Sequence, residues 1–419
     1  MTITVIAFGS RGDVQPYAAL VVALRACGHD ACLAATDSFA TLAAEANVPF
    51  RSLGPFSPQE IARRPEVQAA IRRGGQLGGL LALMRASRPL MTSILEGCWR
   101  VTADACAVVI PSIPFGALDS ALARDLPAIS APLHSFTPTR AFPSPFFAPL
   151  GIRLDAQENR LTYHVMRGAL WAMMGGVLNR WRRDKGLPAT SGGHFFAELD
   201  STRISTIYGF SPAVLPAPRD LPPWHHVTGY WFLDALAGYQ PPVTLAQFLA
   251  SGPKPIAIGF GSMDDQRPQE RTGVVLEALQ RCGKRAVLLA GWGGFAEAQL
   301  PPSVCLVDAA PHSWLFPQVS VVVHHGGAGT TAAALRAGIP SVIAPFGGDQ
   351  HFWARRLTQL GVGVAGEPLA RLTATGLASA IEKVTGDTRL QRRAAALGSI
   401  IQGEGGAERA ALIIARAVA

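Results

Sequence analysis

The segment His324–Thr331, HHGGAGTT, combines glycines, paired histidines and hydroxyl side chains in a pattern that suits phosphate binding. The largely apolar run 319–323 before it predicts a buried strand, and the alanine-rich run 332–337 after it predicts a helix. A glycine turn between a strand and a helix presents backbone N–H groups at the positive end of the helix dipole. We therefore predict that this turn binds a phosphate group. An ordinary packing turn stays open as the alternative for this segment alone.

A candidate general base follows the first predicted strand. The turn over 8–16 reads FGSRGDVQP, which is neither a P-loop nor the G-x-G-x-x-G dinucleotide fingerprint. It places Asp13 at the carboxyl edge of a sheet, where open α/β sheets bind ligands. A carboxylate there can accept a proton from a reacting hydroxyl, and it can equally cap the helix that follows.

A second acid stands beside an amide in the loop 344–350. Asp349 and Gln350 suit sugar hydroxyl groups, because a carboxylate accepts hydrogen bonds and an amide both donates and accepts them. Helix capping is again the alternative for Asp349. Adjacent histidines on a strand point in different directions, and the chain has neither an Asp-x-Asp pair nor a G-x-S-x-G elbow. We therefore expect no metal site and no serine hydrolase chemistry.

The composition predicts a folded protein of the cytoplasm. The 419 residues are 49% hydrophobic and 16% charged, which favours a large core and little disorder. Six scattered cysteines without a C-x-x-C pair predict free thiols in a reducing compartment. Because we find neither a secretory signal nor an apolar stretch long enough to span a bilayer, we expect a cytoplasmic location.

The net charge of +8 is densest in two stretches. The first contains Arg63, Arg64, Arg72, Arg73, Arg85 and Arg88, and the second contains Arg180, Arg182, Arg183 and Lys185. Basic amphipathic segments can lie on an anionic membrane, which would place the protein peripherally at the inner face of the membrane. More often such charges form a solvated helix face. Nucleic acid is not an expected partner, since no recognition motif accompanies the charge. The oligomeric state stays open.

Strands and helices alternate in both halves of the chain, which predicts two α/β domains with parallel sheets. We predict a first domain over 1–225, a proline-rich linker over 226–243 and a second domain over 244–400, with a final helix over 401–419 returning to the first domain. The predicted strands are 3–8, 31–35, 107–110, 128–130, 256–259, 286–289, 304–307, 319–324 and 341–344.

Together these motifs resemble those of the GT-B fold UDP-glycosyltransferase superfamily, glycosyltransferase family 1. Within it they are most similar to the sterol 3β-glucosyltransferase-like and antibiotic glycosyltransferase branches. The resemblance is carried by 9–16, 139–143, 311–317, 324–331 and 348–353. It implies a GT-B fold, in which two Rossmann-like α/β domains face each other across a cleft, with the acceptor on the first and the donor on the second. Because about 55–100 and 150–205 match no motif, the resemblance implies that acceptor choice is made there.

The resemblance also implies residue roles. Asp13 matches the catalytic base, and Asp119 is a candidate for the acid that orients the base in related enzymes. The loop around the base is formed by Gly9, Ser10, Arg11 and Gly12. The donor-binding residues would be Ser262, Pro311, His312, Trp314, His325, Gly327, Ala328, Gly329, Thr330, Asp349 and Gln350. The acceptor pocket would include Thr139, Arg140 and Phe142, and the nearby aromatic residues Trp171, Trp181, Phe195 and Phe196 fit a lipophilic acceptor or an ordinary core.

The activity implied is inverting transfer of a hexose from a UDP- or dTDP-linked sugar to a hydroxyl of a lipophilic acceptor, such as a sterol, hopanoid, polyketide or hydroxy fatty acid. The nucleotide sugar is then a co-substrate, and no cofactor is expected. One alternative is a sugar-nucleotide epimerase or hydrolase of the same fold, which the long apolar insertions disfavour. Another is a non-catalytic donor-binding partner of a transferase, which would not need Asp13 together with His325 and Asp349.

Overall fold

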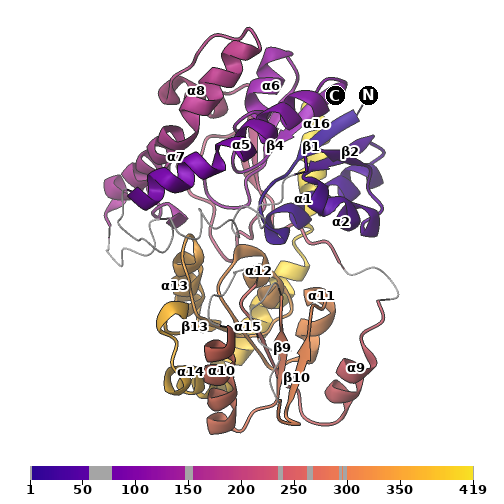
Figure 1. The fold of residues 1–419 in the computed structure, drawn as a ribbon, viewed down its shortest axis with the longest axis vertical. Coiled ribbons are helices and arrows are strands. Elements are labelled where there is room, and N and C mark those ends of the chain that lie inside the picture. The colour runs from indigo at the N-terminus through magenta and orange to yellow at the C-terminus, as the bar shows by residue number, and fades with distance from the viewer. Residues whose placement is uncertain are drawn as a thin grey trace. The chain divides into compact units, whose positions relative to one another are not determined.

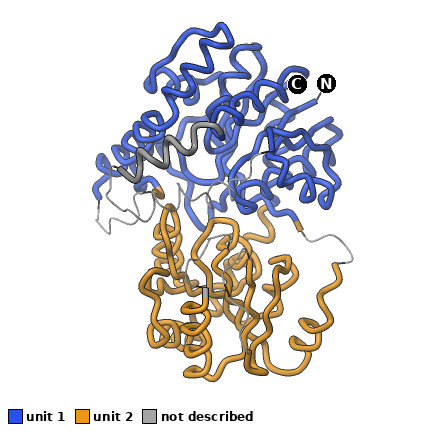
Figure 2. Tube along the Cα trace, viewed as in Figure 1, with its two compact units in different colours: residues 1–144, 153–233, 405–419 blue, residues 145–152, 234–404 orange. Residues whose placement is uncertain are grey.

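The computed structural model divides into two compact units (Figure 2). Unit 1 comprises residues 1–144, 153–233 and 405–419, and unit 2 comprises 145–152 and 234–404. The structure describes residues 2–55, 78–146, 154–234, 239–261, 268–291, 295 and 300–418, with the backbone alone over 78–89 and at residue 268.

Unit 1 contains a parallel sheet whose seven described strands run in the order β3-β2-β1-β4-β5-β6-β7 (Figure 1). They are β1 (Thr2–Ile6), β2 (Ala31–Ala35), β3 (Phe50–Ser52), β4 (Ala105–Ile110), β5 (Ala128–Ser130), β6 (Ser205–Tyr208) and β7 (His225–Val227). The described helices are α1 (Arg11–Ala26), α2 (Ala40–Glu45), α5 (Gly78–Val101), α6 (Ala117–Ala123), α7 (Ala156–Asp184), α8 (Gly192–Leu199) and α16 (Gly406–Val418).

The last helix, α16, packs on α1 within unit 1 (Figure 1). Its buried residues recur at helical spacing and form one apolar face. At the start of α16, a Cβ added to Gly406 would lie only 2.4 Å from the carbonyl oxygen of Tyr230. The glycine therefore allows the helix to begin directly against the chain that follows β7.

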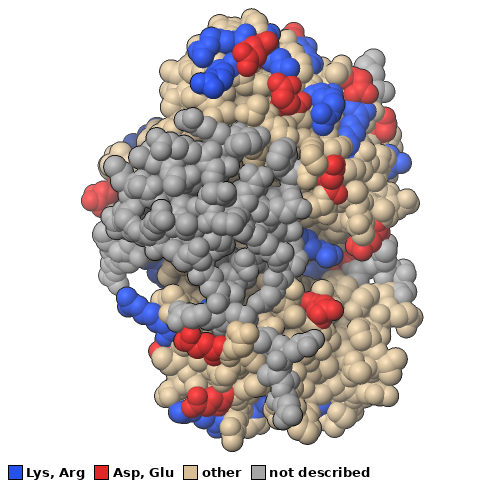
Figure 3. Space-filling view, in the orientation of Figure 1, with Lys and Arg blue, Asp and Glu red and all other residues tan. Residues whose placement is uncertain are grey.

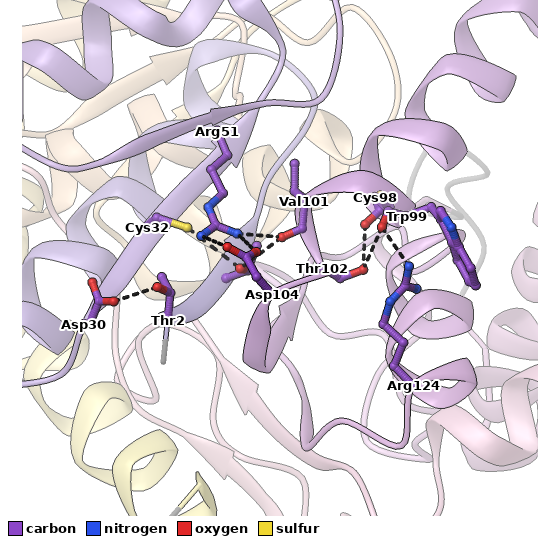
Figure 4. A network of polar contacts seen from close by, with 11 residues as sticks. Thr2, Asp30, Cys32, Arg51, Cys98, Trp99, Val101, Thr102, Asp104 and Arg124 are labelled. Carbon is purple, nitrogen blue, oxygen red and sulfur yellow. Dashed lines mark hydrogen bonds and ion pairs between the residues drawn. The ribbon is translucent and has the colours of Figure 1, made fainter.

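Polar contacts tie the amino ends of the strands of unit 1 to neighbouring segments (Figure 4). The guanidinium of Arg51, on β3, donates to the carbonyl of Val101 at 3.0 Å and pairs with the carboxylate of Asp104 just before β4. Thr2 donates to Asp30 at 2.6 Å. These contacts fix the edge of the sheet opposite to the one at which Asp13 lies, so they have a structural role.

Unit 2 contains a second parallel sheet, with its six described strands in the order β10-β9-β8-β11-β12-β13 (Figure 1). The strands are β8 (Ile256–Gly259), β9 (Ala286–Leu289), β10 (Val304–Val307), β11 (Val321–His324), β12 (Ser341–Ile343) and β13 (Gly363–Ala365). The described helices are α9 (Val243–Ala250), α10 (Pro268–Cys282), α11 (His312–Leu315), α12 (Ala328–Arg336), α13 (Gln350–Leu360), α14 (Ala374–Gly386) and α15 (Thr388–Gln402).

Both faces of the second sheet are buried. Val321 and Val323 point into a cluster with residues of α10 and α14, and Val322 points into the opposite cluster with residues of α9, α11 and α12. This alternation is the period-two pattern of a strand covered on both sides. The prediction of two parallel, Rossmann-like α/β domains is confirmed, and each predicted strand is present with its ends shifted by no more than two residues. Unit 1 extends to Leu233 and includes residues 226–233 of the predicted linker.

Candidate active site

The glycine turn of unit 2 has the predicted strand–turn–helix geometry. β11 ends at His324, and α12 begins at Ala328 with Gly327 as its N-cap residue. The first N–H groups of a helix lack acceptors within the helix, so those of Ala328, Gly329 and Thr330 mark the positive end of α12. This turn has the backbone chemistry of an anion site.

The imidazole of His325 is held between two glycines. A Cβ added to Gly261, after β8, would lie 2.5 Å from Cε1 of His325, and one added to Gly327 would lie 2.6 Å from its Nε2. Burial lowers the pKa of His325 to about 4, so its ring is neutral at pH 7. Its Nδ1 is buried without a hydrogen-bond partner among the described residues. His325 is therefore placed to hydrogen-bond a ligand at the helix terminus.

The other histidine of the pair has a structural position. Nδ1 of His324 accepts a hydrogen bond from the backbone N–H of Gly326 at 3.1 Å. The side chain is completely buried, and burial lowers its pKa well below the usual value. His324 therefore shapes the turn from inside the unit.

The Asp349–Gln350 loop packs directly on this turn. A Cβ added to Gly326 would lie 3.3 Å from the Cβ of Gln350. The Gln350 side-chain oxygen accepts from the backbone N–H groups of Phe346 at 2.7 Å and of Gly347 at 3.2 Å. The amide oxygen is thus held by its own loop, which leaves the NH₂ group as the donor of this amide.

Asp349 is the N-cap residue of α13, yet its carboxylate does not cap the helix. Oδ2 accepts instead from the indole N–H of Trp353 at 2.8 Å. Burial raises the pKa of Asp349, and the indole donor opposes that shift. The side chain thus keeps acceptor capacity beside the turn, where a sugar hydroxyl can use it.

Residues in the segment before β11 lie at the same carboxyl-terminal edge of the sheet of unit 2 as the glycine turn. Pro311 is the N-cap residue of α11, and the ring of His312 stacks on Phe316 with centroids 4.4 Å apart. Trp314 is half-buried and contacts Tyr239 edge-on at 5.3 Å. Ser262 lies outside the described residues. The other predicted donor residues of unit 2 all lie in segments that adjoin β11, β12 and α11.

Asp13 lies in the first turn of α1 and takes part in its cap. Oδ2 accepts from the backbone N–H and from the hydroxyl of Ser10, both at 2.7 Å. Gly9 has φ +132°, and a Cβ there would lie 2.6 Å from the same oxygen. Asp13 is nevertheless exposed, as is Arg11, whose guanidinium donates to Gln15 at 3.3 Å. Capping therefore orients the carboxylate without burying it.

The segment that follows β5 contains His134, which is half-buried. Burial lowers the pKa of His134 to about 4, while the negative charge of Asp13 acts in the opposite direction.

Asp119 has two described partners within unit 1. Its carboxylate accepts from the backbone N–H of Gly116 at 3.1 Å, capping α6, and forms an ion pair with Arg182 of α7. Only 2% of Asp119 is exposed, and burial raises its pKa. The acid therefore joins α6 to α7.

The residues expected in the acceptor pocket form a fixed loop. Thr139 is completely buried and donates to Asp220 at 2.5 Å, and the backbone N–H of Arg140 donates to the same carboxylate at 2.8 Å. Thr139 thus anchors the loop, while Arg140 is exposed and Phe142 half-buried. Of the nearby aromatic residues, Trp181, Phe195 and Phe196 are buried in the core, and Trp171 is half-buried.

A cavity of about 490 Å³ lies at the opposite, amino-terminal edge of the second sheet. Two of its three basic residues, Lys254 and Arg285, bond to backbone carbonyls. Lys254 donates to the carbonyl of Pro317 at 2.8 Å, and Arg285 donates to the carbonyls of Pro253 and Phe248 near the end of α9. The glycine turn lies at the other, carboxyl-terminal edge of the same sheet, so the cavity is separate from it.

Of the two predicted basic stretches, the structure describes the side chains of the second. The residues of the first stretch, from Arg63 to Arg88, have side chains outside the described residues. In the second stretch, Arg182 pairs with Asp119 and Lys185 with Glu96. On the face drawn in Figure 3, basic side chains over unit 1 lie beside acidic ones.

Within the described part of the chain, no helix combines the length and the apolar character needed to cross a bilayer. Over the same residues, no group of three or more His, Cys, Asp and Glu side chains is arranged to hold a metal ion.

Comparison with known proteins defines the class. Residues 3–101 match the glycosyltransferase family 28 N-terminal domain, and residues 290–402 match the erythromycin biosynthesis protein CIII-like C-terminal domain. The chain belongs to the GT-B fold glycosyltransferase superfamily, a family of sugar-transferring enzymes.

Individual relatives are consistent with this class. The chain is 34% identical over 420 residues to a sterol 3-beta-glucosyltransferase of Emericella nidulans, covering 97% of this chain and 29% of the relative. It thus spans less than a third of that protein's length. A solved glycotransferase of kitacinnamycin has a TM-score of 0.75 at 18% identity, covering 100% of this chain and 99% of that one. The glycosyltransferase VinC, solved in complex with dTDP, has a TM-score of 0.67 at 15% identity, covering 100% and 99%.

Proposed function

We propose that the chain is an inverting glycosyltransferase that moves a hexose from a UDP- or dTDP-linked donor to the hydroxyl of a lipophilic acceptor, with a sterol as the first acceptor to test. The observation that carries the proposal is the neutral, glycine-flanked His325 beside the start of α12, with Asp349 and Gln350 packed on the same turn. The sterol acceptor is supported by the names of relatives such as the Emericella protein, and the nucleotide by the dTDP complex of VinC.

In this mechanism unit 2 binds the donor. The backbone N–H groups at the start of α12 and the ring of His325 hydrogen-bond the diphosphate, and Asp349 and Gln350 hydrogen-bond the sugar hydroxyls. Negative charge grows on the diphosphate as the glycosidic bond breaks. Fixed donors and the helix dipole stabilise that charge more in the transition state than in the ground state, which lowers the barrier.

Asp13 supplies the base. It accepts the proton of the acceptor hydroxyl while the hydroxyl oxygen attacks the anomeric carbon and the nucleoside diphosphate leaves from the opposite face. The configuration at the anomeric carbon is thereby inverted. General-base assistance of this kind typically contributes about 10²–10⁴-fold to the rate.

Two variants and a chelator test the proposal. Asp13→Asn should abolish transfer while leaving the affinity for UDP or dTDP unchanged, because only proton removal is lost. His325→Ala should weaken nucleotide binding by roughly 1.5–3 kcal/mol, the usual contribution of a hydrogen bond to a charged group. EDTA should leave transfer unchanged, because N–H donors and His325 meet the charge of the leaving group.

The contrary results are equally definite. Normal turnover in Asp13→Asn would reduce Asp13 to a helix cap. Unchanged nucleotide affinity in His325→Ala, measured by calorimetry, would remove the turn from the donor site. Activity that EDTA abolishes and Mg²⁺ or Mn²⁺ restores would overturn the metal-free mechanism. Nucleotide release without any acceptor product would instead favour the hydrolase alternative.

A further inference from the structure

The backbone of His324 connects the two segments of the candidate donor site. His324 is the last residue of β11, and it pairs with Ile343 at the end of β12. Its carbonyl accepts from the backbone N–H of Ala344 at 2.9 Å, where the loop that carries Asp349 and Gln350 begins. His324 therefore lies where the glycine turn and this loop both leave the sheet.

The side chain of His324 bonds to the glycine turn itself. Its Nδ1 accepts from the backbone N–H of Gly326 at 3.1 Å. Gly326 has φ +93°, and a Cβ added to it would lie 2.7 Å from Cγ2 of Ile343 and 3.2 Å from the carbonyl oxygen of Gln350. Gly326 thus contacts both the imidazole of His324 and the start of α13, so its position fixes the turn relative to the Asp349–Gln350 loop.

The same hydrogen bond defines the tautomer of His324. A ring nitrogen that accepts a hydrogen bond carries no proton, so the proton of the neutral imidazole is on Nε2. The ring is completely buried, and burial lowers its pKa well below the usual value, so it stays neutral at pH 7. An imidazolium would carry a proton on both nitrogens and could not accept from Gly326. His324 is therefore a fixed acceptor.

Beyond Gly326 the chain passes directly into α12. The N–H of Thr331 donates to the carbonyl of Gly327 at 2.9 Å, which closes the first turn of the helix. The N–H groups of residues 328–330 precede this bond, and the ring of His325 lies against Gly327. A change in the direction of the chain at Gly326 would therefore move both kinds of donor that the turn offers to a diphosphate.

We propose that His324 is a positioning residue that, by accepting the N–H of Gly326 at its Nδ1, aims His325 and the N–H groups at the start of α12 at the diphosphate of the donor. The proposal rests on the proposed function, in which this turn binds the diphosphate. Because His324 is completely buried, it would act on the nucleotide only through the turn.

The test compares side chains that keep or remove the acceptor. In His324→Asn the amide oxygen can accept from the N–H two residues further on, as asparagine does in Asx turns. His324→Leu has nearly the same shape as His324→Asn but no acceptor. Calorimetry on the full chain with UDP and with dTDP should show a Kd increased on the order of 10-fold in His324→Leu, because the hydrogen bonds from the turn to the charged diphosphate are weakened. His324→Asn should recover most of the affinity.

A double-mutant cycle with His325→Ala separates positioning from a general loss of packing. If His324 acts by aiming His325, His324→Leu should change Kd less in the His325→Ala background than in the unaltered chain, because one of the donors that it positions is already absent. A purely structural role would lower Tm in both His324 variants without separating their nucleotide affinities.

The tautomer is measured on the unaltered chain. Nitrogen NMR of the imidazole should place the proton of His324 on Nε2 at neutral pH, and a proton on Nδ1 would overturn the proposal, because Gly326 would then have no acceptor there. If His324→Leu does not fold, His324→Gln is the variant in which the acceptor is displaced, because its amide lies one bond further from the backbone. The expectation for the nucleotide affinity is the same.

Nucleotide affinity in His324→Leu equal to that of the unaltered chain would overturn the role of His324. So would an equal loss in His324→Leu and His324→Asn, or fully additive effects in the cycle. The His325→Ala variant keeps the two proposals distinguishable. If His325→Ala weakens binding while both His324 variants bind normally, the inference fails and the donor site stands. If His325→Ala itself binds normally, the proposed function fails and the inference fails with it.

Discussion

Replacing Gly327 with alanine should weaken nucleotide binding without removing any polar group. Gly327 has φ −59° and ψ 140°, which any residue can adopt, so the substitution introduces no backbone strain. The added Cβ would lie 2.6 Å from Nε2 of His325. Ordinary carbon contacts are about 3.5–4.0 Å, so the imidazole has to move by about 1 Å.

The size of the effect follows from that displacement. A hydrogen bond of about 2.9 Å is lost once its atoms are about 3.6 Å or more apart. Hydrogen bonds to charged groups contribute roughly 1.5–3 kcal/mol, which corresponds to roughly a 10–150-fold increase in Kd for the nucleoside diphosphate. Gly327→Ala should thus approach the effect of His325→Ala although the histidine is still present.

Calorimetry with UDP and with dTDP measures this change. The matched control is Gly273→Ala on α10, where an added Cβ meets no atom within 4 Å. That control should keep normal affinity and gain about 0.4–1 kcal/mol of stability, because alanine restricts the unfolded chain. If Gly327→Ala binds both nucleotides as tightly as the unaltered chain does, the position of His325 in the donor site is refuted.

Two further predictions concern the carboxylates of unit 2. Trp353→Phe removes the indole N–H that donates to Asp349, so it should raise KM for the nucleotide sugar while leaving the affinity for UDP alone unchanged; an equal loss for UDP would show that Asp349 does not act on the sugar. Asp387 caps α15, and backbone N–H donors lower its pKa. A lowered folded-state pKa stabilises the fold above the unfolded-state pKa and loses that effect as the pH falls through the folded-state value. Asp387→Ala should therefore lower Tm at neutral pH and have less effect in acid, and a Tm difference independent of pH would contradict this.

The parts of the fold that could be predicted are those with local signals. β2, β4 and β9 are apolar runs that burial on both faces requires, so they stand out in the sequence. β6 and β7 do not, because Ser205–Tyr208 and His225–Val227 are short and include polar residues. They become strands through pairing with β5 and with each other, which a local pattern does not show.

In the candidate site, too, the residues that could be predicted are those with a local sequence pattern. The glycine turn and the Asp349–Gln350 pair are contiguous motifs, so the sequence could indicate their chemistry. Gly261 leaves room for the ring of His325, although the two residues are far apart in the chain. The partner of Asp119 is likewise distant, since Arg182 lies 63 residues further along. Such pairings arise only from tertiary packing.

The anomeric configuration of the product tests the proposed transfer most directly. The chain would be incubated with α-linked UDP-glucose and a sterol in the presence of EDTA, and the isolated glycoside examined by proton NMR. We predict a β-linked sterol glucoside formed in equal amount to the UDP released, because Asp13-assisted attack displaces the diphosphate from the opposite face. An α-linked glucoside, or UDP release without glycoside, would contradict the mechanism.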